Sequence, residues 1–134
     1  METMHIIDKD YMDLWYHPES KIVHHKMKKI LPDGAHKELL STGADYMEKY
    51  GAIKWLSDDS DMVIVKEEGY RWADKEWVPR VLKAGFKYWA IVKPSDSIVG
   101  NVQMNRFVKE YQERGVIVEV FETVEAAMAW LESK

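Results

Sequence analysis

The sequence predicts an α/β fold in which a mixed β-sheet begins as an N-terminal antiparallel meander and continues as β-α units, with helices packed on the sheet. Before residue 30, short segments alternate apolar and polar side chains between turn residues. From residue 33 onward, helical and extended patterns take turns along the chain. Residues 67–85 have helical spacing and lead directly into 87–92, which is nearly continuously apolar. Residues 1–134 accommodate all of these segments as a single domain.

The first third of the chain has the period of two that is typical of half-buried strands. Residues 4–7 form a short apolar start, and residues 12–16 and 22–27 alternate on either side of a turn at 17–20. Within the second segment Met12, Leu14 and Tyr16 share the core face, which leaves Trp15 on the opposite face.

The next segments predict a helix followed by a strand. Asp33 stands where it would cap a helix, and Gly51 suits a left-handed C-terminal position. After that helix, residues 53–56 predict a short strand, 57–61 an acidic loop and 62–65 a brief extended piece.

The second half alternates helices and buried strands. A helix from about residue 67 carries an apolar stripe, and Pro79 is expected to kink or restart it, because proline removes a backbone hydrogen bond. Residues 86–92 and 116–121 are apolar enough for buried strands, and between them a helical region is expected in two pieces with Asn105 as a second cap. Thr123 is expected to cap the last helix. Since helices link them, the strands at 53–56, 86–92 and 116–121 should be mutually parallel.

Composition narrows the possible functions. Lys plus Arg is 19 and Asp plus Glu is 23, and this formal net charge of −4 disfavours a nucleic-acid surface, which needs clustered cations. The absence of cysteine excludes disulfides and thiolate chemistry. No apolar run approaches the ~20 residues of a membrane-spanning helix, and the first residues lack the pattern of a signal peptide. We therefore expect a cytoplasmic protein that does not span a membrane.

Two places could carry a site. Asp58, Asp59 and Asp61 cluster where a strand is expected to end, the edge at which open α/β sheets bind ligands; they could hold a divalent metal or perform acid–base work, or form a solvated loop. A ligand pocket needs apolar walls with a few polar groups, which the chain offers near the same loop. The expected ligand-binding residues are Trp55, Ser57, Asp58, Trp72 and Trp77.

Other signals of chemistry are missing from the sequence. The glycines stand alone, so no phosphate-binding loop is predicted, and no cofactor is expected. His24 and His25 are adjacent and would point to opposite faces of a strand, and no suitable carboxylate or cysteine spacing indicates zinc. We therefore predict no catalytic residues and no metal ligands.

Four segments carry a resemblance to a known family: Lys-Trp-Leu-Ser-Asp at 54–58, Trp-Val-Pro-Arg at 77–80, the strand motif at 85–92 and the helix motif at 121–131. With the order of elements, they make the chain resemble the small single-domain bacterial proteins of the STAS superfamily, named for sulfate transporters and anti-sigma-factor antagonists. That resemblance implies a mixed sheet flanked by helices. It also implies a regulatory Ser or Thr that is phosphorylated at the start of the helix after a central strand. Residues 65–69, where that position falls, contain no hydroxyl, and the nearest hydroxyl residues are Ser57 and Ser60.

The functional hypothesis is a non-enzymatic, STAS-like binding or regulatory module for a protein partner or a small apolar ligand. The alternative is a small enzyme or a divalent-metal site built on the Asp58-Asp59-Asp61 loop. Trp15 and Trp72 both fall outside the expected core stripes, and exposed indoles often mark contacts, so a homodimer is also expected.

Overall fold

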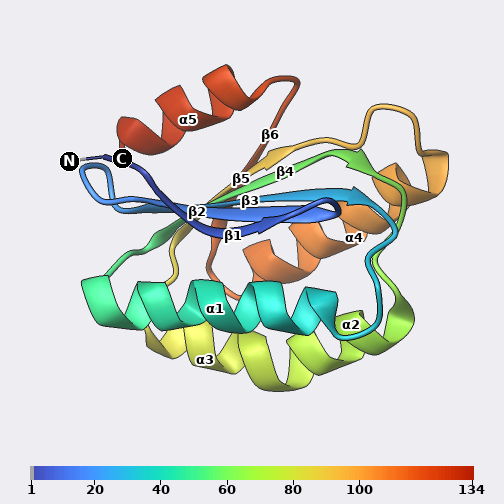
Figure 1. The fold of residues 1–134 in the computed structure, drawn as a ribbon, viewed down its shortest axis with the longest axis horizontal. Helices are drawn as coiled ribbons and strands as arrows, with labels where there is room; N and C mark the ends of the chain where they lie inside the picture. The colour runs from blue at the N-terminus through green and yellow to red at the C-terminus, as the bar shows by residue number, and fades with distance from the viewer. Residues whose placement is uncertain (1) are drawn as a thin grey trace.

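A computed structural model describes residues 2–134 as a six-stranded mixed sheet with helices on both faces (Figure 1). The strands lie in sequence order across the sheet. They are β1 (Met4–Lys9), β2 (Met12–His17), β3 (Ile22–Lys29), β4 (Lys54–Met62), β5 (Tyr88–Val92) and β6 (Ile117–Phe121). The helices are α1 (Ala35–Tyr50), α2 (Glu67–Trp72), the π-helix η1 (Ala73–Trp77), α3 (Val78–Lys83), α4 (Ile98–Glu113) and α5 (Val124–Glu132).

The strand directions confirm the predicted topology. β1, β2 and β3 form an antiparallel meander, and β3, β4, β5 and β6 are parallel to one another in succession. The α-helical links between the parallel strands account for these directions, because each link returns the chain to the same end of the sheet.

The predicted acidic loop at residues 57–61 is wrong, because β4 continues through it to Met62. Its carboxylates stay in the strand by pairing with lysines of β3: Lys26 is the register partner of Asp58, and Lys28 that of Asp61. Opposite charges facing each other across a ladder stabilise the pairing, which offsets the poor strand propensity of aspartate.

The sheet has two unequal faces. In Figure 1, α1 to α4 lie below it and α5 lies above it. The main core includes Met12, Leu14 and Tyr16, as predicted, and is packed beneath α1 to α4. A smaller core under α5 joins Leu56 and Ala90 to Leu131. Because α5 packs over β4, β5 and β6, much of the same face of β1 and β2 has no helix over it.

Of the three predicted N-terminal helix caps, two are wrong and one is confirmed. Asp33 forms no cap; Gly34 enters α1 with a φ of 81°, and the Asp33 carboxylate instead accepts a hydrogen bond from Lys66 Nζ at 2.8 Å. α4 is one continuous helix capped by Ser97, so Asn105 starts no second piece. Thr123 caps α5 as predicted, accepting from the Ala126 N–H at 3.2 Å.

The helix expected from residue 67 contains one wide turn. η1 separates α2 from α3, and the Val78 N–H reaches back to the Ala73 carbonyl. Pro79 then lies in the first turn of α3, where its missing N–H costs little. The backbone stays helical through the junction, so the interruption expected at Pro79 takes the form of a π-helical turn before the proline and not of a break.

Candidate functional site

A cavity of about 70 Å³ lies between the sheet and the helices of the α1 face. Side chains of β3, β4 and β5 form its floor, and η1 and α4 form its roof. Three indoles make up much of its wall: Trp55, Trp77 and Trp89. The cavity also reaches the carboxyl half of β4, the side of an α/β sheet where ligands commonly bind.

A second pocket, of about 130 Å³, opens beside the first between the starts of α1 and α2. Lys37, Gly69 and Trp72 line it. Four residues line both pockets, so only their side chains separate the two: Met27, His36, Met62 and Val65. The two form neighbouring inner and outer compartments.

A buried chain of hydrogen bonds crosses the floor of the inner compartment. Trp55 Nε1 lies 2.9 Å from His25 Nδ1, and His25 Nε2 lies 2.9 Å from Asp59 Oδ1. Because an indole N–H can only donate, Nδ1 must accept, so the His25 proton sits on Nε2 and is donated to the Asp59 carboxylate. The direction of the chain from Trp55 through His25 to Asp59 is therefore set by hydrogen-bond chemistry.

The other two wall indoles are also fixed. Trp89 Nε1 donates to Ser57 Oγ at 2.7 Å, and Trp77 Nε1 donates to the Leu40 carbonyl at 2.7 Å. Each buried indole N–H has a partner, which holds each ring in one orientation. The walls of the inner compartment are thus preorganised.

His36 is the polar group left without a partner between the two compartments. Its Nδ1 is buried and makes no hydrogen bond among the described residues. Burial is the main reason that the pKa of His36 falls to about 4, and the neighbouring His25 lowers it further. An interaction with the Gly69 backbone that does not reach hydrogen-bond geometry acts in the opposite direction. The ring is therefore neutral near pH 7 and has unused hydrogen-bonding capacity, which buried groups rarely retain unless something else satisfies it.

Four of the five expected ligand-binding residues lie at these compartments. Trp55, Ser57 and Trp77 line the inner one, and Trp72 lines the outer one. Asp58 does not join them: it lies on the opposite face of β4, where its Oδ1 accepts from Ser60 Oγ at 2.6 Å. Strand alternation is the reason, since neighbouring residues point to opposite faces.

Sequence reasoning assigns Asp59 only to the acidic-loop hypothesis and misses His25, His36 and Trp89 as residues of the pocket. Asp59 has the same parity as Trp55 and Ser57, so a strand drawn through residue 59 would have revealed it. No sequence signal marks His36, because its role depends on how α1 meets α2.

The three aspartates of the alternative hypothesis do not face a common point. Asp58 and Asp59 lie on opposite faces of β4, where Asp59 is paired with His25. Asp61 is largely exposed, and its carboxylate lies 3.2 Å from Lys26 Nζ. Among the described residues these three aspartates therefore do not converge on one metal position, although Asp58 and Asp61 both lie near Lys26 Nζ, at 3.7 and 3.2 Å.

Histidines and one indole line the face of β1, β2 and β3 opposite α1, here called the open face. The Trp15 ring stacks on His5 with centroids 5.1 Å apart and contacts His24 at 4.6 Å. His17 Nε2 lies 3.1 Å from His24 Nδ1. Burial, followed by the proximity of His17 and His25, lowers the pKa of His24 to about 3.

The neutral His24 makes stability sensitive to acid. Its pKa is about 3 when folded and 6.5 as a free group, so above pH 6.5 neither state takes up a proton there. As the pH falls below 6.5, this histidine takes up a proton in the unfolded chain but not in the folded one. The free energy of unfolding should therefore fall by about 1.4 kcal/mol for each pH unit. Urea unfolding at about pH 7.5 and about pH 5 measures the loss, which His24→Phe should reduce; equal losses in both proteins would contradict the assignment.

No helix among residues 2–134 combines the length and apolar character needed to cross a membrane.

Comparison with known proteins gives one clear structural relative. No family model matches the chain, and no curated protein does. A crystal structure of an uncharacterised protein of the DUF3478 family with a SpoIIAA-like fold, from Shewanella loihica PV-4, superposes with a TM-score of 0.56. The superposition covers 97% of this chain and 92% of that one, at 17% sequence identity. The chain has a SpoIIAA-like fold. This is the fold of the STAS superfamily, as the sequence resemblance implies.

In this chain, α2 begins after β4 at the position where the resemblance implies a phosphorylated hydroxyl. Lys66 occupies the N-cap of α2, and no Ser or Thr lies within residues 65–69. Ser57 is 2% exposed and accepts a hydrogen bond from Trp89, so it offers no accessible substitute.

Proposed function

We propose that this chain is a non-enzymatic binding module whose paired compartments take a small, neutral, apolar molecule with one hydroxyl or carbonyl group. The observation that carries the proposal is His36 Nδ1, which is buried and unpartnered between the compartments. An apolar molecule filling the inner compartment would meet the indole walls and direct its polar end to this nitrogen. Such a combination of apolar walls and few polar groups is typical of ligand pockets.

The size and charge of the compartments support the same class of ligand. Engineered apolar cavities of about 150 Å³ bind benzene. The inner compartment measures about 70 Å³ and the outer about 130 Å³, so a molecule of that size has to occupy both. Its mouth carries Lys37 and Lys66 as well as Asp33 and Glu68, so the charges balance. Lys66 is moreover paired with Asp33. A neutral molecule is favoured over an anion, because the two lysines at the entrance are matched in number by two carboxylates.

Cyclohexanol is a suitable probe, with cyclohexane as its counterpart that lacks the hydroxyl. In a nitrogen-15 NMR titration, the indole N–H signals of Trp55, Trp77 and Trp89 should shift on addition of cyclohexanol. The signals of Trp15 and Trp130 should not move, because both rings lie on the other side of the sheet, Trp15 on the open face and Trp130 on α5. Cyclohexanol should bind more tightly than cyclohexane, since only the alcohol can pair with His36.

A matched pair of substitutions tests the position of the site. Ala73 is buried in η1 and lines the inner compartment, so Ala73→Leu should fill it and weaken cyclohexanol binding at least about tenfold. Ala129→Leu adds the same atoms on the exposed side of α5 and should leave binding unchanged. Equal effects of both substitutions, or shifts at Trp15, would refute the proposed cavity.

We also propose that this chain binds a protein partner in the cytoplasm. The simplest candidate for that partner is a second copy of the same chain. The apolar surface that supports it is on α4, where Ile98, Val99 and Val102 are 85%, 57% and 66% exposed. Trp15 and Trp72 offer less free apolar surface for such a contact, because Trp15 stacks on His5 and Lys37 Nζ lies over the Trp72 ring. Light scattering of the NMR samples gives the mass directly, and one chain at every dilution would refute the dimer.

A further inference from the structure

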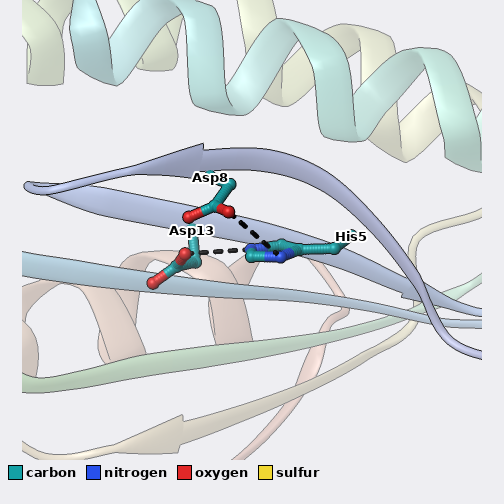
Figure 2. Close-up of side chains that lie close together, drawn as sticks. All are labelled: His5, Asp8 and Asp13. Atoms are coloured by element: carbon teal, nitrogen blue, oxygen red, sulfur yellow. Dashed lines mark hydrogen bonds and ion pairs between the residues drawn. The ribbon is translucent and has the colours of Figure 1, made fainter.

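A second cluster of side chains lies on the open face, away from the compartments. Figure 2 shows the carboxylates of Asp8 and Asp13 on the same side of the His5 imidazole, each joined to the ring by a dashed line. Its Nε2 is 2.9 Å from Asp13 Oδ1 and its Nδ1 is 3.8 Å from Asp8 Oδ2. One ligand atom from each of the three residues can be chosen so that all lie within 4.8 Å of one another.

A β-bulge creates this cluster. In a regular strand, residues 5 and 8 would point to opposite faces. The register of β1 on β2 pairs His5 with Trp15 and Ile7 with Leu14, so Ile6 is an extra residue. Ile6 and Ile7 consequently both contact the main core, and His5 and Asp8 both point to the open face.

The cluster combines a fixed part with an adjustable part. Asp13 is 8% exposed, and the His5 ring is held against Trp15 with an interplanar angle of 16°. The Asp8 side chain is 80% exposed and is free to rotate its carboxylate. Two positioned ligand atoms and one mobile carboxylate can adapt to an ion without disturbing the sheet.

The charge arrangement independently favours a cation here. Asp8 and Asp13 are direct partners in the ladder between β1 and β2. Like charges directly opposite each other destabilise a strand pair. Lys28 offsets this repulsion only in part, because it supplies one positive charge for two carboxylates; its Nζ lies 3.6 Å from Asp13 Oδ2.

We propose that His5, Asp8 and Asp13 bind one divalent first-row transition metal ion, with Zn²⁺ as the representative ion and water completing the coordination. Zinc binds histidine nitrogen and carboxylate oxygen at about 2.0–2.2 Å, so two such atoms on one tetrahedral ion stand roughly 3.3 Å apart. The 2.9 Å between His5 Nε2 and Asp13 Oδ1 needs only a small opening to reach that geometry. An imidazole ligand favours zinc, cobalt or nickel over magnesium and calcium, which prefer oxygen alone.

The test is calorimetric titration of ZnCl₂ into untagged, metal-free protein in a buffer that does not chelate zinc. We expect saturable binding of one ion per chain, weakened at least about tenfold by His5→Gln and by Asp8→Asn. His17→Gln is the matched control, since His17 lies on the open face but is paired with Thr3 and His24. That variant should bind zinc as the original chain does.

Thermal unfolding gives a second measurement that does not depend on the heat of binding. Zinc should raise the Tm of the original chain and of His17→Gln, and should raise that of Asp8→Asn far less. Because Asp8 is highly exposed, this variant should fold. Absence of saturable binding, binding insensitive to His5→Gln, or equal binding of MgCl₂ would each overturn the proposed site.

Discussion

Gly43→Ala is expected to lower the free energy of unfolding by about 3 kcal/mol, the upper range for overpacking a core. Gly43 lies in α1 directly over Trp55, and an added Cβ would overlap the ring at Cη2 and stand 2.5 Å from Cζ3. The ring cannot retreat easily, because Trp55 is 1% exposed, its N–H is bonded to His25, and Trp77 packs edge-on against it. Alanine normally stabilises a helix relative to glycine by roughly 0.5–1 kcal/mol. A loss of stability on Gly43→Ala, in place of this gain, would therefore already indicate the overlap.

A double substitution separates the overlap from other effects of Gly43→Ala. Trp55→Phe removes the outer ring atoms that the new methyl group would meet. If the overlap is the cause, the two substitutions together should destabilise the chain by clearly less than the sum of the single effects in urea unfolding. Additive losses, or a Gly43→Ala protein as stable as the original, would show that the contact is wrong.

His25→Leu is expected to cost about 3–5 kcal/mol, because each buried donor or acceptor left unpaired costs roughly 1–3 kcal/mol, and a charged one costs more. The substitution leaves two buried groups without partners at once. One is the Trp55 N–H, and the other is the Asp59 carboxylate, on a residue that is 7% exposed. Leucine fills a similar volume, so the loss reports on hydrogen bonding more than on packing.

His25→Gln is the control for that experiment. Glutamine carries one acceptor and one donor, so it can accept from Trp55 and donate to Asp59 in the same order as the histidine. It should therefore recover a large part of the stability that leucine loses, as measured by chemical unfolding near neutral pH. A glutamine variant no better than leucine would mean that the ring itself, and not the relay of hydrogen bonds, holds this part of the core.

The fold was predictable from the sequence because its determinants are local. The alternation of Met12, Leu14 and Tyr16 sets one face of the meander, and the apolar stretch at 86–92 requires a strand covered on both sides. The end of β4 was not predictable in this way. Residues 57–61 have the composition of a turn, and only pairing with the lysines of β3 keeps them extended.

The candidate site was predictable only in part for a related reason. Trp55, Ser57 and Trp77 come from patterns visible in the sequence, and they do line the inner compartment. His36 depends on the approach of α1 to α2, which involves residues far apart in the chain. The His5 cluster depends on a bulge, and one extra residue in a ladder leaves almost no trace in a strand with isoleucine at both 6 and 7.

The π-helical turn at Ala73–Trp77 amounts to a helix with one residue too many. In an α-helix each residue advances about 100° around the axis. Deleting one residue within this turn would therefore swing everything before it by about that angle relative to α3. Tyr70 would leave the inner compartment and the outer compartment would lose its Trp72 wall. The extra residue thus rotates α2 relative to α3 about the helix axis. As a result, Trp77 faces the inner compartment and Trp72 faces the outer one.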